Sequence, residues 1–292
     1  MGGAPLISVV IPTYQRPERI RQALLHFAEL QFPPEDYELI VVDDGTVPPL
    51  DSATLAAPHG VVLTVLRVPH GGSGAARNAG VARAKGELIA FLADDCEPAS
   101  DWLQAFDAAH RQHPHCALGG KIIHGLPNDP FSTTADLLIQ YMRTRGNSDP
   151  LHSTFFTPNN FAVPAAGFRD IGGFDPQFNP AGEDRDFCAR WIGAGRRMIT
   201  LDTARVVHRH PLTFLGFLRM QYIHGRGSML FRQVLAKRNG GRVHLESPNY
   251  YTGLLLFPRN WPERFGLRHV ALLVLSQLAV AAGAARALFG KK

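Results

Sequence analysis

The amino-acid sequence predicts an α/β fold with a mostly parallel central sheet, flanked by helices and followed by a C-terminal helical extension. Short β-branched runs of strand length alternate with segments of helical periodicity over the first 123 residues. Polar and acidic residues follow these runs directly, as they do beyond the carboxyl ends of parallel strands. With 292 residues, 45% of them hydrophobic, the chain can bury one substantial core and a smaller appended unit.

The elements of the first half are predicted from the periodicity of apolar side chains. Leu6–Ile11 is an apolar run that Pro12 ends, and the next helical pattern begins with a proline, which suits a first helical turn. The predicted helices are Pro17–Glu29, a glycine-rich segment that ends near Ala84, and Ala99–Gln112. The strands predicted after the first are Leu39–Val42, Val61–Val68, Leu88–Ala93 and Cys116–Ile123.

The pattern is less regular in the second half of the chain. Pro- and Asn-rich flanks surround a helical segment, Phe131–Arg143, and suit the lid of a binding site. The elements predicted beyond it are a loop with a short strand over Thr157–Pro164, a short helix over Ala165–Ile171, a helix opened by Gly182 and a strand over Thr200–Val207.

Acidic residues follow two of the predicted strands. Asp44 comes after the second strand, and Asp94 and Asp95 come after the fourth. Because crossovers between parallel strands are right-handed, the strand tips share one edge, where Thr13, Asp44, Arg77 and Asp95 are expected to converge. One carboxylate of a pair can hold a hard divalent cation such as Mg²⁺ or Mn²⁺. Taken alone, two Asp after a strand are more typical of a polar turn that caps the next helix.

The glycine-rich run 71–80 resembles a dinucleotide-binding fingerprint only faintly. Arg77 stands where that fingerprint needs its third glycine, and the run follows the third strand instead of the first. The sequence therefore does not predict a Rossmann cofactor site. Arg77, at the start of a helix, can contact a phosphate or a neighbouring carboxylate, and a solvated arginine is the alternative.

A third group of candidate residues lies late in the chain. Glu183 and Asp184 stand in the first turn of the helix opened by Gly182. Acidic residues there complement the helix dipole, which is worth roughly 0.3–1 kcal/mol. A carboxylate that opens from a glycine-rich loop into a cleft is also well placed as a general base. His208 ends a predicted strand, and this place at a strand tip favours a role in the site.

Composition limits the class of protein and its partners. Thirty Lys and Arg against 25 Asp and Glu give a formal charge of +5, which favours anionic ligands or surfaces. No recognition signature or basic block indicates nucleic acid. Cys96, Cys116 and Cys188 are widely spaced and predict neither a disulfide framework nor a zinc site, so a reducing compartment fits. The first apolar run is short and lacks a basic region before it, which predicts a strand and a cytoplasmic location.

Five short motifs occur in one order along the chain: Val10–Arg16, Val41–Gly45, Ala76–Gly80, Phe91–Cys96 and Gly182–Asp186. Together they resemble the family 2 glycosyltransferases, inverting enzymes with the Rossmann-like GT-A fold that use nucleotide-diphosphate sugars. The resemblance covers about residues 6–227. The acidic metal motif of this family often begins with Asp where this chain has Ala93, and the pair Asp94-Asp95 is similar to members that read Asp-Asp here.

The resemblance implies a role for each matching residue. Asp95 would bind Mn²⁺ or Mg²⁺, with His208 completing the metal or diphosphate site. Asp184, beside Glu183, would be the base that takes the proton from an acceptor hydroxyl in a single displacement. A UDP- or GDP-sugar would be the donor, and the acceptor would be a carbohydrate, a lipid-linked sugar or a peptide. The donor would be bound by Pro12, Thr13, Tyr14, Arg16, Asp44, Arg77 and Asp94.

The predicted catalytic domain is 1–211, with a nucleotide-sugar half (1–123) and an acceptor half (124–211), and 212–292 form the extension. Within it, Leu212–Lys237 is a predicted helix that Gly225-Arg-Gly227 bends. Val270–Ala285 is apolar but shorter than the roughly 20 residues that span a bilayer. Three roles of this segment remain open: internal packing, contact with a second subunit, and peripheral membrane contact through 265–292 at the cytoplasmic face. The basic residues that flank the segment suit a surface of anionic lipid.

Two other function classes remain open from the sequence. A nucleotidyltransferase acting on sugar phosphates would share the sheet and the acidic metal ligands. It would carry a Gly-rich basic loop after the first strand, where this chain has Pro-Thr-Tyr-Gln-Arg. A non-catalytic nucleotide-sugar-binding protein would keep the fold without turnover.

Overall fold

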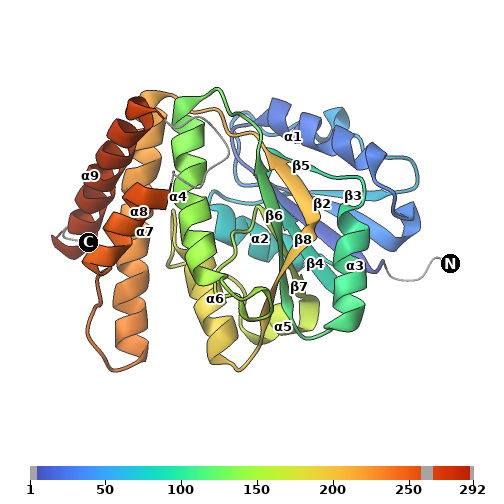
Figure 1. The fold of residues 1–292 in the computed structure, drawn as a ribbon. Helices are drawn as coiled ribbons and strands as arrows, with labels where there is room; N and C mark the ends of the chain where they lie inside the picture. Colours follow the sequence, from blue (N-terminus) through green and yellow to red (C-terminus); the bar gives the residue numbers. More distant parts are fainter. Residues whose placement is uncertain (1–4, 258–265, 290–292) are drawn as a thin grey trace.

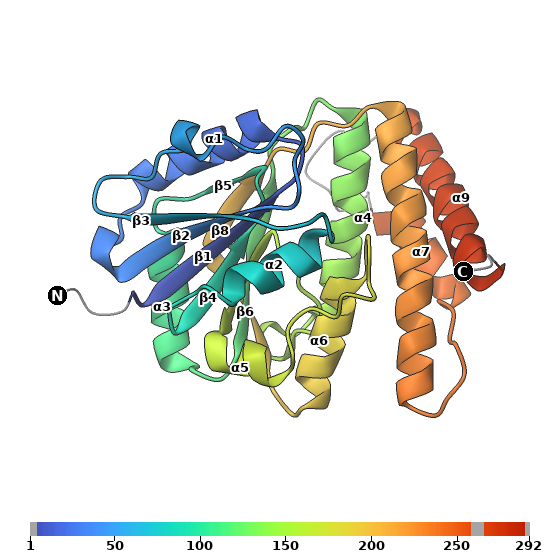
Figure 2. The same cartoon turned by 180° about the vertical axis from the view of Figure 1, so that it is seen from behind.

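The computed structural model describes residues 5–257 and 266–289, and its centre is one eight-stranded sheet with helices on both faces (Figures 1 and 2). The order of the strands in the sheet is β3-β2-β1-β4-β7-β6-β8-β5. The predicted α/β class, with a mostly parallel sheet and C-terminal helices, is confirmed. The strands are β1 (Ile7–Thr13), β2 (Tyr37–Asp43), β3 (Val62–Arg67), β4 (Leu88–Leu92), β5 (Cys96–Pro98), β6 (Ala117–His124), β7 (Asn160–Pro164) and β8 (Met198–His208).

Helices form layers on the two faces and a further layer at one end. The longer helices are α1 (Pro17–Leu25), α2 (Ser73–Val81), α3 (Trp102–Gln112), α4 (Pro130–Gly146), α5 (Ala165–Asp170), α6 (Glu183–Gly193), α7 (Phe214–Arg238), α8 (Pro248–Leu256) and α9 (Leu267–Phe289). Most predicted boundaries lie within about three residues of these, the usual uncertainty of element boundaries predicted from sequence. In both views α7 and α9 run side by side, and α9 is the outermost helix (Figures 1 and 2).

The first half of the sheet is parallel. β1 lies between β2 and β4 and pairs in parallel with both, and β3 adds to β2 in the same sense. Every residue of β2 and β4 is buried, as expected for parallel strands covered on both faces. The carboxyl ends of these strands therefore share one edge, from which Thr13, Asp44 and Asp94 emerge.

The second half of the sheet is mixed. β7 runs antiparallel to β4 and β6, β8 runs parallel to β6, and the short β5 runs antiparallel to β8. The β5–β8 ladder sets Cys96 opposite His208. This register brings Asp95, one residue before β5, beside the end of β8, although 113 positions separate Asp95 from His208.

Two apolar clusters hold the helices against the sheet. On one face, Ile20 of α1 and Trp102 and Phe106 of α3 pack on the strands. On the other, Phe187 and Trp191 of α6 join α2 and α5. Side chains of this size contribute about 1.5–3 kcal/mol each when fully buried, so these clusters fix the strand tips and the start of α6 relative to each other.

The prediction that Pro12 ends the first strand is wrong. β1 continues to Thr13, and Pro12 stands in register with Val42 of β2. On the other side, β4 pairs with β1 only as far as Val10. No ladder hydrogen bond is needed on that side at Pro12, so its missing N–H is tolerated there.

The predicted bend at Gly225-Arg-Gly227 is also absent from α7, which is a continuous helix over Phe214–Arg238. The two glycines allow close packing instead. A Cβ at Gly225 would lie 2.1 Å from the backbone oxygen of Val280 in α9, and one at Gly227 would lie 2.4 Å from that of Ala181. α9 is also longer than the predicted apolar segment 270–285, with 23 residues.

Candidate functional site

One cavity of about 860 Å³ opens along the edge where the parallel strands end. The tips of β1, β2 and β4, the end of β8, the start of α6 and one side of α7 all contribute to its walls. Every residue that the sequence predicts for the site lines this cavity: Pro12, Thr13, Tyr14, Arg16, Asp44, Arg77, Asp94, Asp95, Glu183, Asp184 and His208.

Asp44 is held at one end of the cavity by three donors. The backbone N–H groups of Gly71 and Gly72 donate to its carboxylate at 2.8 and 3.0 Å, and Nδ1 of His70 donates at 2.9 Å. The His70 ring also stacks on Tyr14, with ring centroids 4.1 Å apart. A fixed carboxylate beside a stacked aromatic pair suits the hydrogen bonds and flat faces of a nucleobase.

Asp94 follows β4, which β1 separates from the strand that carries Asp44, and its side chain is buried. The Thr13 hydroxyl donates to Asp94 at 2.8 Å, and Nη1 of Arg16 donates at 3.1 Å. Burial and the negative charge of Asp95 nevertheless raise the pKa of Asp94 above its usual value, and these effects outweigh Arg16 and Thr13.

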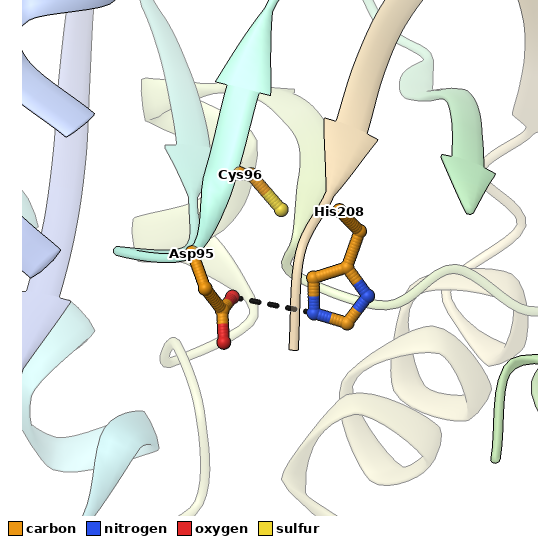
Figure 3. A group of neighbouring side chains, drawn as sticks. All are labelled: Asp95, Cys96 and His208. Atoms are coloured by element: carbon orange, nitrogen blue, oxygen red, sulfur yellow. Dashed lines mark ion pairs between the residues drawn. The ribbon is translucent and has the colours of Figure 1, made fainter. Parts of the chain in front are cut away.

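The carboxylate of Asp95 contacts two histidines and two arginines. Its carboxylate lies 3.2 Å from Nε2 of His208 (Figure 3), 2.7 Å from Nδ1 of His210, 3.3 Å from Arg16 and 3.2 Å from Arg19. Burial alone would raise the pKa of Asp95, but hydrogen bonds from the two histidines hold it well below its usual range. The same contact raises the pKa of His208 against the effect of burial. Asp95 is therefore an anion under all ordinary conditions.

The residues around Asp95 suit a hard divalent cation. Ligand atoms of Asp95, Cys96 and His208 all lie within 4.8 Å of one another. Burial raises the pKa of the Cys96 thiol well above its usual value, so Cys96 stays protonated and is a poor ligand. The remaining carboxylate oxygen and imidazole nitrogen are a donor set that Mn²⁺ accepts, with room for further oxygen ligands.

A second acidic pair lies at the start of α6. Gly182 precedes it with φ of +105°, and a Cβ there would lie 2.9 Å from the Gly227 backbone oxygen of α7, so glycine is required by both conformation and space. Glu183 accepts a hydrogen bond from the Ser73 hydroxyl at 2.8 Å and lies 3.6 Å from the buried guanidinium of Arg77. Glu183 is thus tied to the start of α2.

Asp184 differs from its neighbour. The contact described for its carboxylate is the backbone N–H of Arg185, at 2.8 Å. Burial first, and then the negative charge of Glu183, raise the pKa of Asp184 to about 6. A cavity-lining carboxylate with a pKa near neutrality can accept a proton from a ligand and hold it.

Sequence reasoning missed several residues of the site. Arg19 follows Arg16 by three positions in α1, and His210 follows His208 by two in extended chain, so each shares a face with a predicted residue. This spacing is a signal that the sequence offers. No such signal marks His70 or Ser73, because contacts distant in sequence bring them to Asp44 and Glu183. Arg219 and Arg232 of α7 also line the cavity.

Comparisons with known proteins agree with the fold. The family model described as "Glycosyl transferase family 2" matches residues 8–172. A pre-mycofactocin glycosyltransferase of Mycobacterium tuberculosis is 29% identical over 225 residues, which cover 75% of this chain and 46% of that protein. Glycosyltransferase AglE of Haloferax volcanii is 25% identical over 228 residues, covering 77% of this chain and 73% of AglE. The chain thus spans about half the length of the first of these relatives.

Two solved structures share this fold. The mannosyltransferase PcManGT from Pyrobaculum calidifontis, in complex with GDP-Man and Mn²⁺, superimposes with a TM-score of 0.67 at 18% identity, covering 99% of this chain and 89% of that one. S. aureus TarS 1–349 in complex with UDP-GlcNAc gives a TM-score of 0.52 at 18% identity, covering 95% and 89%.

Proposed function

Because the chain belongs to glycosyltransferase family 2, we propose that it transfers a sugar from a nucleotide-diphosphate sugar to an acceptor hydroxyl. One observation carries this proposal: two acidic pairs with opposite electrostatic character line a single cavity. The solved relatives contain GDP-Man with Mn²⁺ in one case and UDP-GlcNAc in the other. They support a UDP- or GDP-sugar as the donor.

In this proposal the nucleotide binds at the tips of β1 and β2. The stacked rings of Tyr14 and His70 and the carboxylate of Asp44 would meet the nucleobase. Asp94, which Thr13 and Arg16 orient, would accept a hydrogen bond from a ribose or sugar hydroxyl. The diphosphate would then lie toward Asp95, where Arg16 and Arg19 add positive charge.

Asp95 and His208 are the residues we propose to hold a divalent cation, Mn²⁺ or Mg²⁺. When bound, the cation would supply positive charge where the leaving diphosphate gathers negative charge. His210 would fix the Asp95 carboxylate through its 2.7 Å contact. Arg16 and Arg19, both within 3.3 Å of Asp95, would turn toward the diphosphate oxygens as the donor enters.

Asp184 is the proposed base. The acceptor oxygen would form its bond to the anomeric carbon while the bond to the diphosphate oxygen breaks, and the hydroxyl proton would pass to Asp184. Attack from the side opposite the leaving group inverts the anomeric centre. Glu183 would act as a positioning residue, because its contacts to Ser73 and Arg77 fix the first turn of α6 and its charge raises the pKa of Asp184.

The experiment that tests this function is a donor screen. UDP- and GDP-sugars are incubated with the protein in the presence of Mn²⁺ or of EDTA, and the released nucleoside diphosphate is measured. We expect slow release from one donor class, dependent on Mn²⁺. A chain that releases no nucleoside diphosphate from any donor, and instead makes pyrophosphate from a sugar phosphate and a nucleoside triphosphate, would be a nucleotidyltransferase and would contradict the proposal.

A further inference from the structure

The outermost helix, α9, presents an apolar face to its surroundings. Among the described helices, it alone is long and apolar enough to cross a bilayer, with a mean hydropathy of 1.8 and only 22% of the 18-residue window buried. Leu267 is 89% exposed, Leu278 62% and Phe289 84%. Val270, Val274 and Leu275 are exposed between them. Spacings of three and four residues place the side chains from Leu267 to Leu278 on one stripe, and Phe289, eleven residues further on, lies on the same side of the helix. We call this stripe the α9 outer face.

The side of α9 that packs on the protein is mixed in polarity. The residues buried there are His269, Leu272, Leu273, Ser276 and Gly283. A Cβ at Gly283 would lie 2.0 Å from the backbone oxygen of Tyr222, so α9 and α7 are in close backbone contact. A surface helix of a water-soluble protein normally has apolar residues on its inner side and polar residues on its outer side. In α9 large apolar side chains also cover the outer side, and an exposed apolar face of this size indicates contact with an apolar medium.

The charge of the C-terminal segment identifies that medium. Residues 212–292 contain 12 Lys and Arg against 2 Asp and Glu, a formal charge of +10, whereas residues 1–211 contain 18 against 23, a formal charge of −5. Two such segments would repel each other if the outer faces of two copies met. An anionic lipid surface would instead attract the segment, since each basic residue near it adds favourable energy.

The packing of α9 also limits how it can enter a bilayer. α7 lies along α9 (Figures 1 and 2) and carries Arg219, Arg226, Arg232 and Arg238. A spanning orientation of α9 would carry this charged helix into the hydrocarbon, which is costly for each arginine. α9 can enter only as far as its outer face, as interfacial helices do.

We propose that the α9 outer face docks this protein in the plane of an anionic lipid bilayer. The apolar stripe enters the boundary between headgroups and acyl chains, and basic residues beside it meet the lipid phosphates. Gln277 and Val280 of the same helix line the cavity. Docking therefore brings the cavity next to the membrane surface.

Vesicle binding tests this proposal. The full chain is sedimented with vesicles of phosphatidylcholine alone and with vesicles of equal parts phosphatidylcholine and phosphatidylglycerol. We expect binding to the mixed vesicles, much weaker binding to pure phosphatidylcholine, and a loss of binding as salt is raised. Failure to sediment with the mixed vesicles at low salt would overturn the proposal.

Matched variants test whether α9 is the contact. Leu278→Glu should weaken binding to mixed vesicles at least about tenfold, because a charge replaces a large side chain that enters the interface. Leu25→Glu is the control, since Leu25 is 60% exposed but lies in α1. Thermal unfolding checks that both variants fold. Equal weakening by the two variants would overturn the proposal. So would a wild-type protein that binds no vesicles and instead forms a dimer that Leu278→Glu dissociates.

A fluorophore provides an independent measurement of the same contact. The native cysteines Cys96, Cys116 and Cys188 are all buried, so an environment-sensitive dye attached through Leu278→Cys reports on α9. Its emission should shift to the blue with mixed vesicles. The same dye attached through Leu25→Cys should not respond, and a response at both positions, or only at Leu25→Cys, would contradict docking through α9.

Discussion

Two pairs of adjacent acidic residues line the same cavity, and their surroundings differ. The pair at the tip of β4, Asp94-Asp95, contains a carboxylate that two histidines and two arginines hold in its charged form. The pair at the start of α6, Glu183-Asp184, contains a carboxylate that burial and a negative neighbour push toward its neutral form. Asp95 has a pKa far below the usual value, and Asp184 has one of about 6.

The contacts of a carboxylate, and not its residue type, therefore set its chemical role. A permanently charged acid suits the retention of a cation, whereas an acid with a pKa near neutrality suits the uptake of a proton. The first residue of each pair is held by hydrogen bonds to other side chains: Asp94 by Thr13 and Arg16, and Glu183 by Ser73. Each of the following predictions alters one pair and leaves the other in place.

The largest effect is expected from Asp184→Asn. The amide keeps the size of the side chain but cannot take a proton, so the rate of sugar transfer should fall by about 10³-fold, within the range typical of a lost general base. Single-turnover transfer at saturating donor measures this directly. A variant that keeps the full transfer rate would remove Asp184 from the mechanism.

A smaller loss is expected from Asp95→Ala. The change removes one proposed ligand and leaves His208 alone, so the affinity for nucleoside diphosphate in the presence of Mn²⁺ should fall at least about tenfold. The affinity without Mn²⁺ should change much less. Asp101→Ala, at a half-buried position nearby in the chain whose side chain pairs with Arg205, is the control. Unchanged Mn²⁺ dependence in Asp95→Ala would place the cation elsewhere.

Glu183→Gln should shift a pH profile. Protonation inactivates a base, so wild-type transfer should fall as the pH drops below about 6, the pKa of Asp184. The negative charge of Glu183 is the second cause of that raised pKa, and its removal lowers it. The acid limb of the rate profile should therefore move to lower pH. A merely structural role for Glu183 would reduce the rate at every pH and leave the limb in place.

The smallest effect concerns stability. The folded-state pKa of Asp184 lies above the usual 3.8, so folding favours its protonated form, and that stabilisation is lost as the pH rises through about 6. Asp184→Asn, which is always neutral, should therefore be more stable than the wild type near pH 8, by up to about 3 kcal/mol. Near pH 4 the difference should nearly vanish. Denaturant unfolding at both pH values measures it, and a variant less stable near pH 8 would contradict the raised pKa.

The sequence predicts the parallel half of the sheet well, because local patterns of apolar residues mark its strands. Apolar runs mark β1, β2, β3 and β4, and the acidic residues at their tips follow from chain direction alone. The five motifs then identify the family, which the match over residues 8–172 confirms. Each residue predicted for the site lines the cavity.

Features that depend on contacts distant in sequence were not predictable. The antiparallel insertion of β7 between β4 and β6 has no local signal, because direction is set by tertiary pairing. The sequence predicts a bend at Gly225, whereas in the structure this glycine allows close backbone contact with Val280, a residue distant in sequence. The pKa contrast between Asp95 and Asp184 depends in the same way on His208, His210 and burial.

If the two acidic pairs have separate roles, a variant that cannot transfer sugar should still bind nucleotide and cation as the wild type does. The measurement is a titration of the Asp184→Asn variant with nucleoside diphosphate, with and without Mn²⁺, beside the wild type. We expect equal affinities and the same dependence on Mn²⁺ in the two proteins. A variant that loses Mn²⁺-dependent binding would show that the α6 pair also holds the cation, and would contradict the division of roles.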